Sequence, residues 1–376
     1  MTSSLTPDQA RALWDAGCFA VLTGLPEGSE YGIDGVFNAV KAFSGTKFLP
    51  PGLHILTWSP AAASGSASTL PLRSGYVHYF KPRERVALAW DAASEDVGAP
   101  RTDVSDAELQ GLDKGLAPYP FGQLDVWKRL SGAVTTKIVT TVLGDGRVDG
   151  LAGADGETDA EVAHLAKAAG PLRTLKFPVF DLKRSWRDGA TGDDRTKWVS
   201  DKSVLWEKVV AEVGGEYGPA ALLGTLQLAF ILVLNIWSYA ALGAYRRLLT
   251  LLCRSASATA SPESHGADKA AREVSIQLVA TLAAQLDALP LTAFQTELPD
   301  LDVVYQDELE HLRRNLGHAL GSPGWWSLAP KLRSAWAGLE ASAKRFGWTL
   351  GPLPAGDEDS DEEDEEGEYA PVVVET

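Results

Sequence analysis

The sequence predicts an α+β protein of two domains, with a β-rich N-terminal part and an all-helical C-terminal part. Residues 18–92 contain short runs rich in Val, Ile and aromatic residues, separated by Gly and Pro, which is typical of short β-strands. From about residue 200 onward, apolar residues recur at helical spacing. The 376 residues, of which 45% are hydrophobic, are enough to build two packed cores.

Five short apolar runs define the expected strands. They are Cys18–Leu22, Phe48–Leu49, His54–Trp58, Tyr76–Phe80 and Val86–Trp90. Because they lack βαβ spacing, they predict an antiparallel β-sandwich-like domain or a partly closed barrel. The polar link Lys81–Arg85 has the length of a hairpin connection and is expected to join the last two strands.

Short helices are expected beside these strands. One helix is predicted over residues 7–16 and another over 122–130. Between them, Ser105 and Glu108 have the spacing of a capping box, in which each side chain accepts a hydrogen bond from the other residue's backbone N–H. They predict the start of a helix that ends near Leu116.

Three apolar stripes define helices in the C-terminal part, and we interpret them as core-facing. Their members are Val274, Leu278, Leu282, Leu286 and Leu289; Tyr305, Leu309, Leu312, Leu316 and Leu320; and Leu328, Leu332, Trp336, Leu339, Ala343 and Phe346. The sequence therefore predicts an N-terminal domain over 1–143, a Gly- and Asp-rich irregular linker over 144–199, a helical domain over 200–350 and an acidic tail over 351–376. The tail is expected to be disordered by composition up to its last residues.

The stretch 219–245 has no charged residue and is long enough to span a bilayer. Thr225, Gln227 and Asn235 interrupt it, and several amphipathic helices follow that could cover it. A helix that is apolar on all sides is also found at the centre of a helical bundle. From the residues alone, a buried core helix and the span of a membrane-anchored adaptor both stay open.

Charge and cysteine content narrow the class of protein. Most of the net charge of −16 comes from residues 357–368, where ten of twelve residues are acidic. The pair Arg246-Arg247 is too small a basic patch to predict direct nucleic-acid binding. With only Cys18 and Cys253, the chain has no disulfide framework, which fits a reducing compartment.

The sequence contains no convincing catalytic or metal motif, so we expect no enzyme, no cofactor and no metal site. An acid–base site in the β-domain is the alternative, and Asp34, His54 and Asp91 are its candidate residues. It would require these groups to converge in one pocket. His311 and His318 lie seven residues apart on one expected helix face, and we interpret them as surface histidines and not as metal ligands.

The C-terminal residues carry the strongest functional signal. The segment Tyr369-Ala370-Pro371-Val372-Val373-Val374-Glu375 follows an acidic tether and has strong strand preference. An isolated strand needs a partner for its backbone groups, so we hypothesise that it adds to a sheet edge of another protein. Folding back on its own domain, or no binding at all, are the alternatives.

Serines near this tether and in a helix break are candidate phosphorylation sites. Ser360 lies within an acidic run that favours acidophilic kinases, and a phosphate there would add negative charge and weaken docking. An incidental serine in a solvated run is the alternative. The competing positions in the break between two expected helices are Ser255, Ser257, Ser261 and Ser264.

Six blocks along the chain resemble the Aar-two splicing factor family. They are LPEGSEYGID at 25–34, KFLPPGLH at 47–54, LAPYPF at 116–121, LGTLQLAF at 223–230, RLLTLLCRS at 247–255 and APVVVE at 370–375. One block alone would be weak, but six in the right order are specific. The sequence departs from the family pattern at Thr225, where a Glu is common, and over 144–199, where little aligns.

The resemblance implies a fold, a partner and a role. It implies a β-sandwich-like N-terminal domain and a VHS-like helical domain, with the 219–245 stretch as a soluble core helix. The implied role is non-catalytic assembly of the U5 snRNP in pre-mRNA splicing. The implied partner is pre-mRNA-processing-splicing factor eight, bound through its RNase H-like and Jab/MPN domains. The resemblance also implies that the chain blocks premature helicase binding and that phosphorylation releases it from the partner. We further expect it to be monomeric when free and to occur in cytoplasm and nucleus.

Overall fold

The computed structural model of the chain describes residues 6–41, 43–60, 73–154, 173–296 and 298–354. Its internal contacts divide the chain into two compact units, which we treat separately. The β unit contains 1–128, 135–176 and 231–239, and the helical unit contains 129–134, 177–230 and 240–376. A β-sheet N-terminal region and a helical C-terminal region are therefore confirmed.

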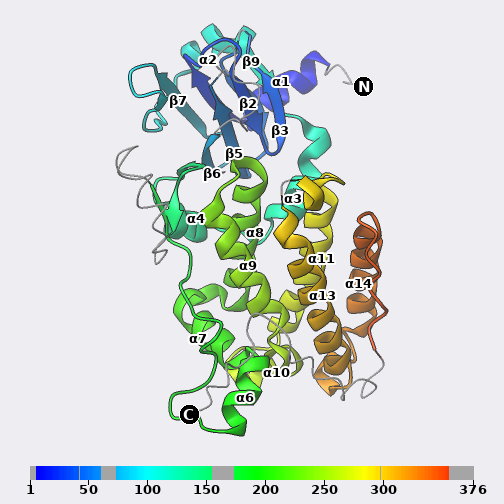
Figure 1. Cartoon of the computed structure of the whole chain (residues 1–376). Helices are drawn as coiled ribbons and strands as arrows, with labels where there is room; N and C mark the ends of the chain where they lie inside the picture. The colour runs from blue at the N-terminus through cyan, green and yellow to red at the C-terminus, as the bar shows by residue number, and fades with distance from the viewer. Residues whose placement is uncertain (1–5, 42, 61–72, 155–172, 297, 355–376) are drawn as a thin grey trace. The chain divides into compact units, whose positions relative to one another are not determined.

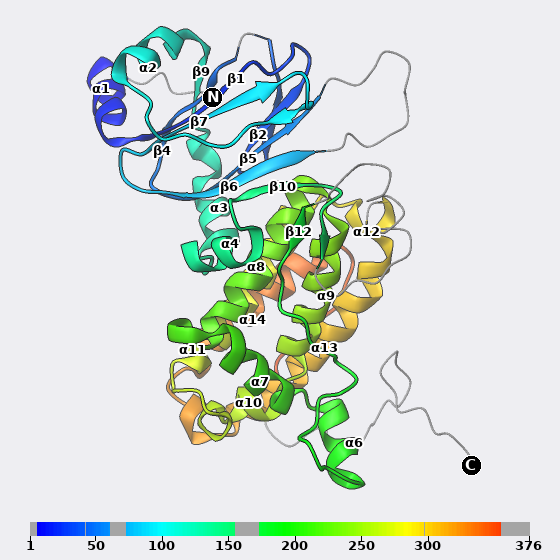
Figure 2. The same cartoon turned by 90° about the vertical axis from the view of Figure 1, so that its left-hand side faces the viewer.

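Two five-stranded sheets form the β unit (Figures 1 and 2). The first has the order β8 (Asp96–Val97), β7 (Arg85–Asp91), β1 (Cys18–Thr23), β4 (Gly45–Leu49), β9 (Leu116–Pro118). The second has the order β10 (Arg147–Asp149), β6 (Ser74–Phe80), β5 (Gly52–Ser59), β2 (Glu30–Ile33), β3 (Val36–Ala39). A separate parallel pair joins β11 (Gly153–Ala154) and β12 (Thr174–Leu175).

The sheets pack on each other through one apolar core, as in a sandwich. Cys18, Ala20 and Leu22 of β1 belong to this core together with apolar residues of β2, β5 and β6. The alternate residues Phe19 and Val21 are also buried, in a second cluster with Leu109 and other residues of the helical segment that follows the strands. Because both faces of β1 are covered, its sequence is continuously apolar and does not alternate with polar residues.

The expectation of a purely antiparallel sandwich is wrong for the first sheet. β1 pairs in parallel with β7, and β4 pairs in parallel with β9. The expected hairpin is also wrong, because β6 and β7 belong to different sheets and Lys81–Arg85 carries the chain between them. Apolar patterns give the faces of a strand but not its neighbour, and a short link can turn within a sheet or cross between two.

Three short helices of the N-terminal half lie where the sequence predicts them: α1 (Pro7–Ala16), α2 (Asp106–Leu112) and α3 (Leu124–Ser131). A fourth helix, α4 (Thr136–Leu143), was not predicted. The Ser105 hydroxyl accepts a hydrogen bond from the Glu108 backbone N–H at 3.2 Å, which confirms the cap at the start of α2. Helix α2 ends at Leu112 and is followed by a 3-10 turn that ends at Gly115, and β9 begins at Leu116.

The helical unit is built from helices that succeed one another along the chain (Figure 1). Their bounds are α6 (Asp193–Ser200), α7 (Ser203–Val213), α8 (Pro219–Ile236), α9 (Tyr239–Cys253), α10 (Ala256–Ala260), α11 (Ala271–Ala288), α12 (Ala293–Thr296), α13 (Pro299–Leu320) and α14 (Ala329–Lys344), and the last part of α8, residues 231–236, belongs to the β unit. The predicted stripes on α11, α13 and α14 are mostly buried, and Leu282, Leu309 and Leu339 are fully inaccessible. Part of the expected linker is ordered, since β10 to β12 and α6 lie within 144–200.

Helix α8 is the one described helix that is long and apolar enough to cross a membrane by composition. Of its 18-residue window, 83% is buried by the rest of the chain. The polar side chains within it are also buried and bonded: the Thr225 hydroxyl donates to the Ala221 carbonyl at 2.7 Å. This burial favours the core-helix interpretation over the membrane span.

Candidate functional site

A buried polar cluster in the β unit joins residues from three of the sequence blocks. Asp34 and Gly35 form the two-residue turn between β2 and β3, and both have left-handed backbone angles, with φ of 50° and 84°. An Asp-Gly pair is a favoured hairpin turn for this reason. The turn places the Asp34 carboxylate beside His54 on β5.

Three donors converge on this carboxylate. His54 Nδ1 lies 2.6 Å from Asp34 Oδ2, and the Tyr119 hydroxyl donates to the same oxygen at 2.7 Å. Asp34 Oδ1 accepts from the Ile55 backbone N–H at 3.0 Å. The second ring nitrogen of His54, Nε2, lies 2.7 Å from the Pro50 carbonyl oxygen.

The Pro50 carbonyl oxygen can only accept, so Nε2 of His54 donates to it, and both ring nitrogens of His54 have a partner within the cluster. Burial and the adjacent Asp34 carboxylate raise the pKa of Tyr119 far above its usual range, which keeps its hydroxyl a donor.

This cluster has the residue types of an acid–base site, but it is closed to solvent and substrate. The side chains of His54 and Asp34 are 1% and 0% exposed, so a substrate cannot reach them. Asp91, the third candidate, lies apart and is exposed. Its carboxylate accepts from the Ala93 N–H at 3.0 Å and the Ser94 hydroxyl at 2.9 Å, and these bonds lower its pKa. The three candidates do not converge, and we interpret the cluster as structural.

The structural role of the cluster is to connect the first three sequence blocks by hydrogen bonds. Asp34, His54 and Tyr119 come from the first, second and third blocks. The Trp127 indole N–H donates to the Leu53 carbonyl at 2.6 Å, which adds a second link from α3 to the histidine strand. The same residues that define the motifs therefore form a buried network that fixes strand β9 and helix α3 on the second sheet.

In the helical unit, Gln227 of the LGTLQLAF block has a comparable role. Its side-chain oxygen accepts from the Ala133 backbone N–H at 2.7 Å, and its amide nitrogen donates to the Thr281 hydroxyl at 3.1 Å. Gln227 is 3% exposed. One buried amide thus connects α8, α11 and the segment between α3 and α4.

A charged cluster surrounds the start of α10, next to the candidate serines. The Arg254 guanidinium donates to Glu308 at 2.9 Å, and the Thr250 hydroxyl donates to the same carboxylate at 2.7 Å. Burial raises the pKa of Glu308, although Arg254 opposes this shift. Lys202 is fully buried, and its ammonium donates to the Leu182 and Val199 carbonyls. Burial, and secondarily Arg254, lower the pKa of Lys202 to about 8.

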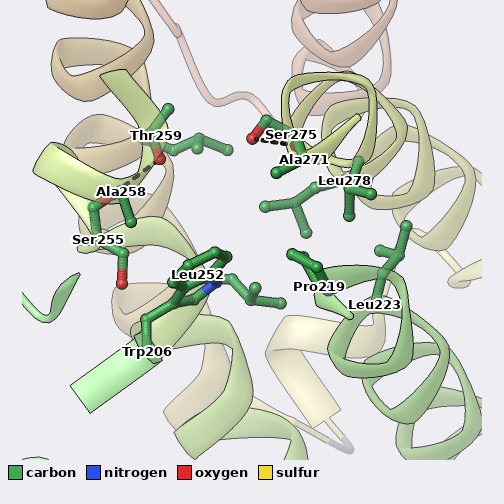
Figure 3. A pocket seen from close by; sticks show the side chains of 12 residues that line it. Trp206, Pro219, Leu223, Leu252, Ser255, Ala258, Thr259, Ala271, Ser275 and Leu278 are labelled. Carbon is green, nitrogen blue, oxygen red and sulfur yellow. Dashed lines mark hydrogen bonds between the residues drawn. The ribbon is translucent and has the colours of Figure 1, made fainter. Parts of the chain in front are cut away.

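The four candidate serines between α9 and α11 differ in solvent exposure. Ser255 is 2% exposed, donates to the Leu251 carbonyl at 2.6 Å and lines a small apolar cavity of about 30 Å³ (Figure 3). Ser257 is half-buried and bonds to Asp201. Ser261 and Ser264 contact each other at 3.0 Å, and Ser264 is exposed.

Asp201 connects two helix starts through both of its oxygens. Oδ1 accepts from the Ser203 backbone N–H at 2.9 Å at the start of α7, and Oδ2 accepts from the Ser257 backbone N–H at 3.1 Å in α10. A phosphate on Ser257 would bring negative charge against this carboxylate. Of the four serines, Ser257 is therefore the one whose modification would separate α7 from α10.

Other candidate residues are placed as follows. The strand segment 369–375 and Ser360 lie outside the described residues. Within the described ranges, no group of three or more His, Cys, Asp or Glu side chains is positioned to hold a metal ion. His318 is exposed, and the His311 side chain is 37% exposed, with partial burial and then Arg254 lowering the pKa of His311 to about 4.

Comparison with known proteins identifies the family. Residues 16–144 match the model of the AAR2 N-terminal domain, and residues 177–351 match that of the AAR2 C-terminal repeat region. The chain belongs to the AAR2 family. It is 27% identical to human Protein AAR2 homolog, over 99% of this chain and 97% of the human protein. It is 28% identical to the mouse homolog over 81% and 82% of the two chains, and 30% identical to the Caenorhabditis elegans homolog over 38% and 39%.

Some residues of the buried clusters could be predicted from the sequence, and others could not. Asp34 and His54 were candidates for chemistry, and the structure brings them together in a buried pair. The role of Tyr119 was missed, because it lies 85 residues from Asp34 and only its membership of the third block marked it. Lys202 was missed because a charged residue at a helix start is usually solvated.

Proposed function

We propose that this AAR2-family chain is a non-catalytic assembly factor in U5 snRNP biogenesis and pre-mRNA splicing. The observation that carries the proposal is the match of both family domains, in order, over 16–144 and 177–351. The burial of the Asp34–His54 pair removes the strongest candidate for an active site, which supports a binding function over an enzymatic one.

The proposed partner is pre-mRNA-processing-splicing factor eight. The family resemblance implies that the C-terminal strand, residues 369–375, joins the RNase H-like domain to the Jab/MPN domain of this partner and blocks early helicase binding. Strand addition uses backbone hydrogen bonds for affinity and alternate side chains for specificity. The acidic run 357–368 would keep the strand extended by self-repulsion and accessible to the partner. We expect the chain to occur in both cytoplasm and nucleus. The family resemblance also implies a VHS-like arrangement of the helical unit.

The strand hypothesis is tested with substitutions that remove backbone donors. Val372→Pro and Val374→Pro remove N–H groups, whereas the matched controls Val372→Thr and Val374→Thr keep them along with β-branched shape. Binding to the recombinant RNase H-like and Jab/MPN domains is measured by calorimetry. We expect the proline variants to lose at least roughly tenfold in affinity, since each lost backbone hydrogen bond is worth about 0.5–1.5 kcal/mol. Equal affinity for the proline and threonine variants would exclude a strand whose N–H groups at 372 and 374 face the partner.

We further propose that phosphorylation releases the partner, through Ser257 or Ser360. Ser257 is supported by its contact with Asp201, which links two helices. Ser360 is supported by its acidic context. Ser257→Glu and Ser360→Glu are compared with the corresponding alanine variants, with Ser264→Glu as an exposed control. Weaker partner binding by one glutamate variant alone identifies the regulatory position. Identical binding by all of them would reject the switch at these sites.

A further inference from the structure

A groove in the β unit has features of a binding site that the assembly role above does not use. It has a volume of about 650 Å³ and lies between α1, α2 and the first sheet. It is lined by Arg11, Trp14, Asp15, Gly17, Phe19, Lys47, Phe48, Arg83, Arg85, Asp106, Gln110 and Asp113. We propose that this groove binds a short peptide segment of a partner protein in which spaced carboxylates flank one aromatic or aliphatic residue.

The charges of the groove leave two arginines uncommitted. The Lys47 ammonium lies 2.5 Å from an Asp113 carboxylate oxygen, and Arg85 is paired with Asp106. The side chains of Arg11 and Arg83 have no carboxylate partner among the residues that the structure describes, and both are exposed. Free guanidinium groups bind carboxylates in a bidentate manner, so Arg11 and Arg83 supply two anchoring points.

An aromatic cluster forms the apolar part of the groove. The Trp14 ring packs edge-on against Phe19 and Phe48, with ring centroids 5.0 Å and 6.4 Å away. Trp14 is half-buried, so one part of its ring stays accessible. An aromatic or aliphatic side chain of a ligand can pack there while its neighbouring carboxylates reach the arginines.

Two groove residues have strained backbones that hold them in place. Phe48 and Arg83 have φ of 68° and 65°, in the left-handed region that non-glycine residues rarely adopt. The Arg83 turn is fixed by Glu84, whose carboxylate accepts from the Lys81 N–H at 2.6 Å and whose carbonyl accepts from the Phe19 N–H at 3.0 Å. Such strain is concentrated at ligand-binding sites, where it positions side chains before binding.

The balance of charge decides the kind of ligand. Asp15, Asp106 and Asp113 also line the groove, next to its four basic residues. Because Asp113 and Asp106 neutralise Lys47 and Arg85, the groove has a net charge of only about +1, too little to hold a continuous polyanion such as nucleic acid, or the run of ten acidic residues within 357–368 of this chain. A peptide with one or two separated carboxylates matches the two free arginines and avoids these three carboxylates. The groove therefore fits a partner segment better than the chain's own acidic run at 357–368.

The test uses the full chain and a fluorescein-labelled peptide with Glu-Ala-Tyr-Glu at the centre of a Gly-Ser frame. Fluorescence anisotropy is measured with this peptide and with a second one in which Gln replaces Glu. We expect the double variant Arg11→Gln, Arg83→Gln to bind the first peptide roughly tenfold or more weakly, because each arginine contributes a charge-assisted contact. The matched control Arg333→Gln, Lys344→Gln, with two exposed cations of α14, should bind like the unmodified chain.

Two substitutions of opposite charge at the rim of the groove give a second test. Gln110 is exposed and lines the groove, so Gln110→Lys should tighten binding and Gln110→Glu should weaken it, and both effects should shrink at high salt. Equal binding of the Glu and Gln peptides, or no response to the Arg11 and Arg83 changes, would overturn the proposal. Binding that requires a phosphoserine peptide, or that occurs only after the acidic residues of 357–368 are changed to Asn and Gln, would also overturn it by assigning another occupant.

Discussion

Removing the Tyr119 hydroxyl tests whether the buried cluster holds the β unit together. In Tyr119→Phe, Asp34 Oδ2 loses the donor at 2.7 Å and keeps His54 at 2.6 Å, while the ring still fills its place beside His54. A hydrogen bond to a charged group contributes about 1.5–3 kcal/mol. We therefore expect a loss of about 2 kcal/mol in the free energy of unfolding of the β unit. Asp34→Ala would leave three buried donors without an acceptor, and we expect it not to fold stably.

The assay is urea denaturation followed by tryptophan fluorescence, since Trp58 and Trp127 are buried in the β unit. With an m-value of about 2 kcal/mol/M, the loss corresponds to a midpoint lower by roughly 1 M urea. The matched control is Tyr79→Phe, because Tyr79 is 43% exposed, and its midpoint should stay within about 0.3 M of the unmodified chain. If the two tyrosine variants unfold at the same urea concentration, the cluster does not stabilise the fold as we argue.

Three further predictions concern other sites. Val274→Ile adds one methyl group beside the cavity of about 30 Å³ and should raise the free energy of unfolding by about 0.5–1 kcal/mol, as measured by thermal unfolding. The control is Val303→Ile, which should leave the free energy of unfolding unchanged because Val303 is 73% exposed. Lys202 has a folded pKa of about 8 against 10.5 when unfolded, so between these values the unfolded state holds more protons and stability rises with pH. The stability of the chain relative to Lys202→Met should accordingly increase by about 2–3 kcal/mol from pH 8 to pH 10.5, and a flat difference would contradict the burial argument. Ser105→Ala removes the cap of α2 and should cost about 1 kcal/mol, seen as a lower urea midpoint.

Local signals in the sequence predicted the local structure well. The Ser105 cap and the apolar stripes of α11, α13 and α14 each depend on residues within a few positions of one another. Such features are set by hydrogen bonds and side-chain spacing along one element. They are therefore readable without knowing the rest of the fold.

Non-local pairing could not be predicted in the same way. The parallel neighbours β1 and β7 have the same apolar pattern that antiparallel neighbours would have. The contact of Tyr119 with Asp34 depends on β9 joining β4, which no local signal specifies. The burial of His54 and Lys202 could not be predicted either, because their polar atoms find partners from distant segments of the chain.

Hydrogen exchange of the C-terminal amides tests the proposed capture of a partner most directly. The full chain is compared alone and in complex with the RNase H-like and Jab/MPN domains, with exchange read by mass spectrometry. A strand added to the partner's sheet predicts slowed exchange at 372–375 in the complex and slowed exchange along one strand edge of the partner. A complex that forms while these amides exchange as fast as in the free chain would contradict the account.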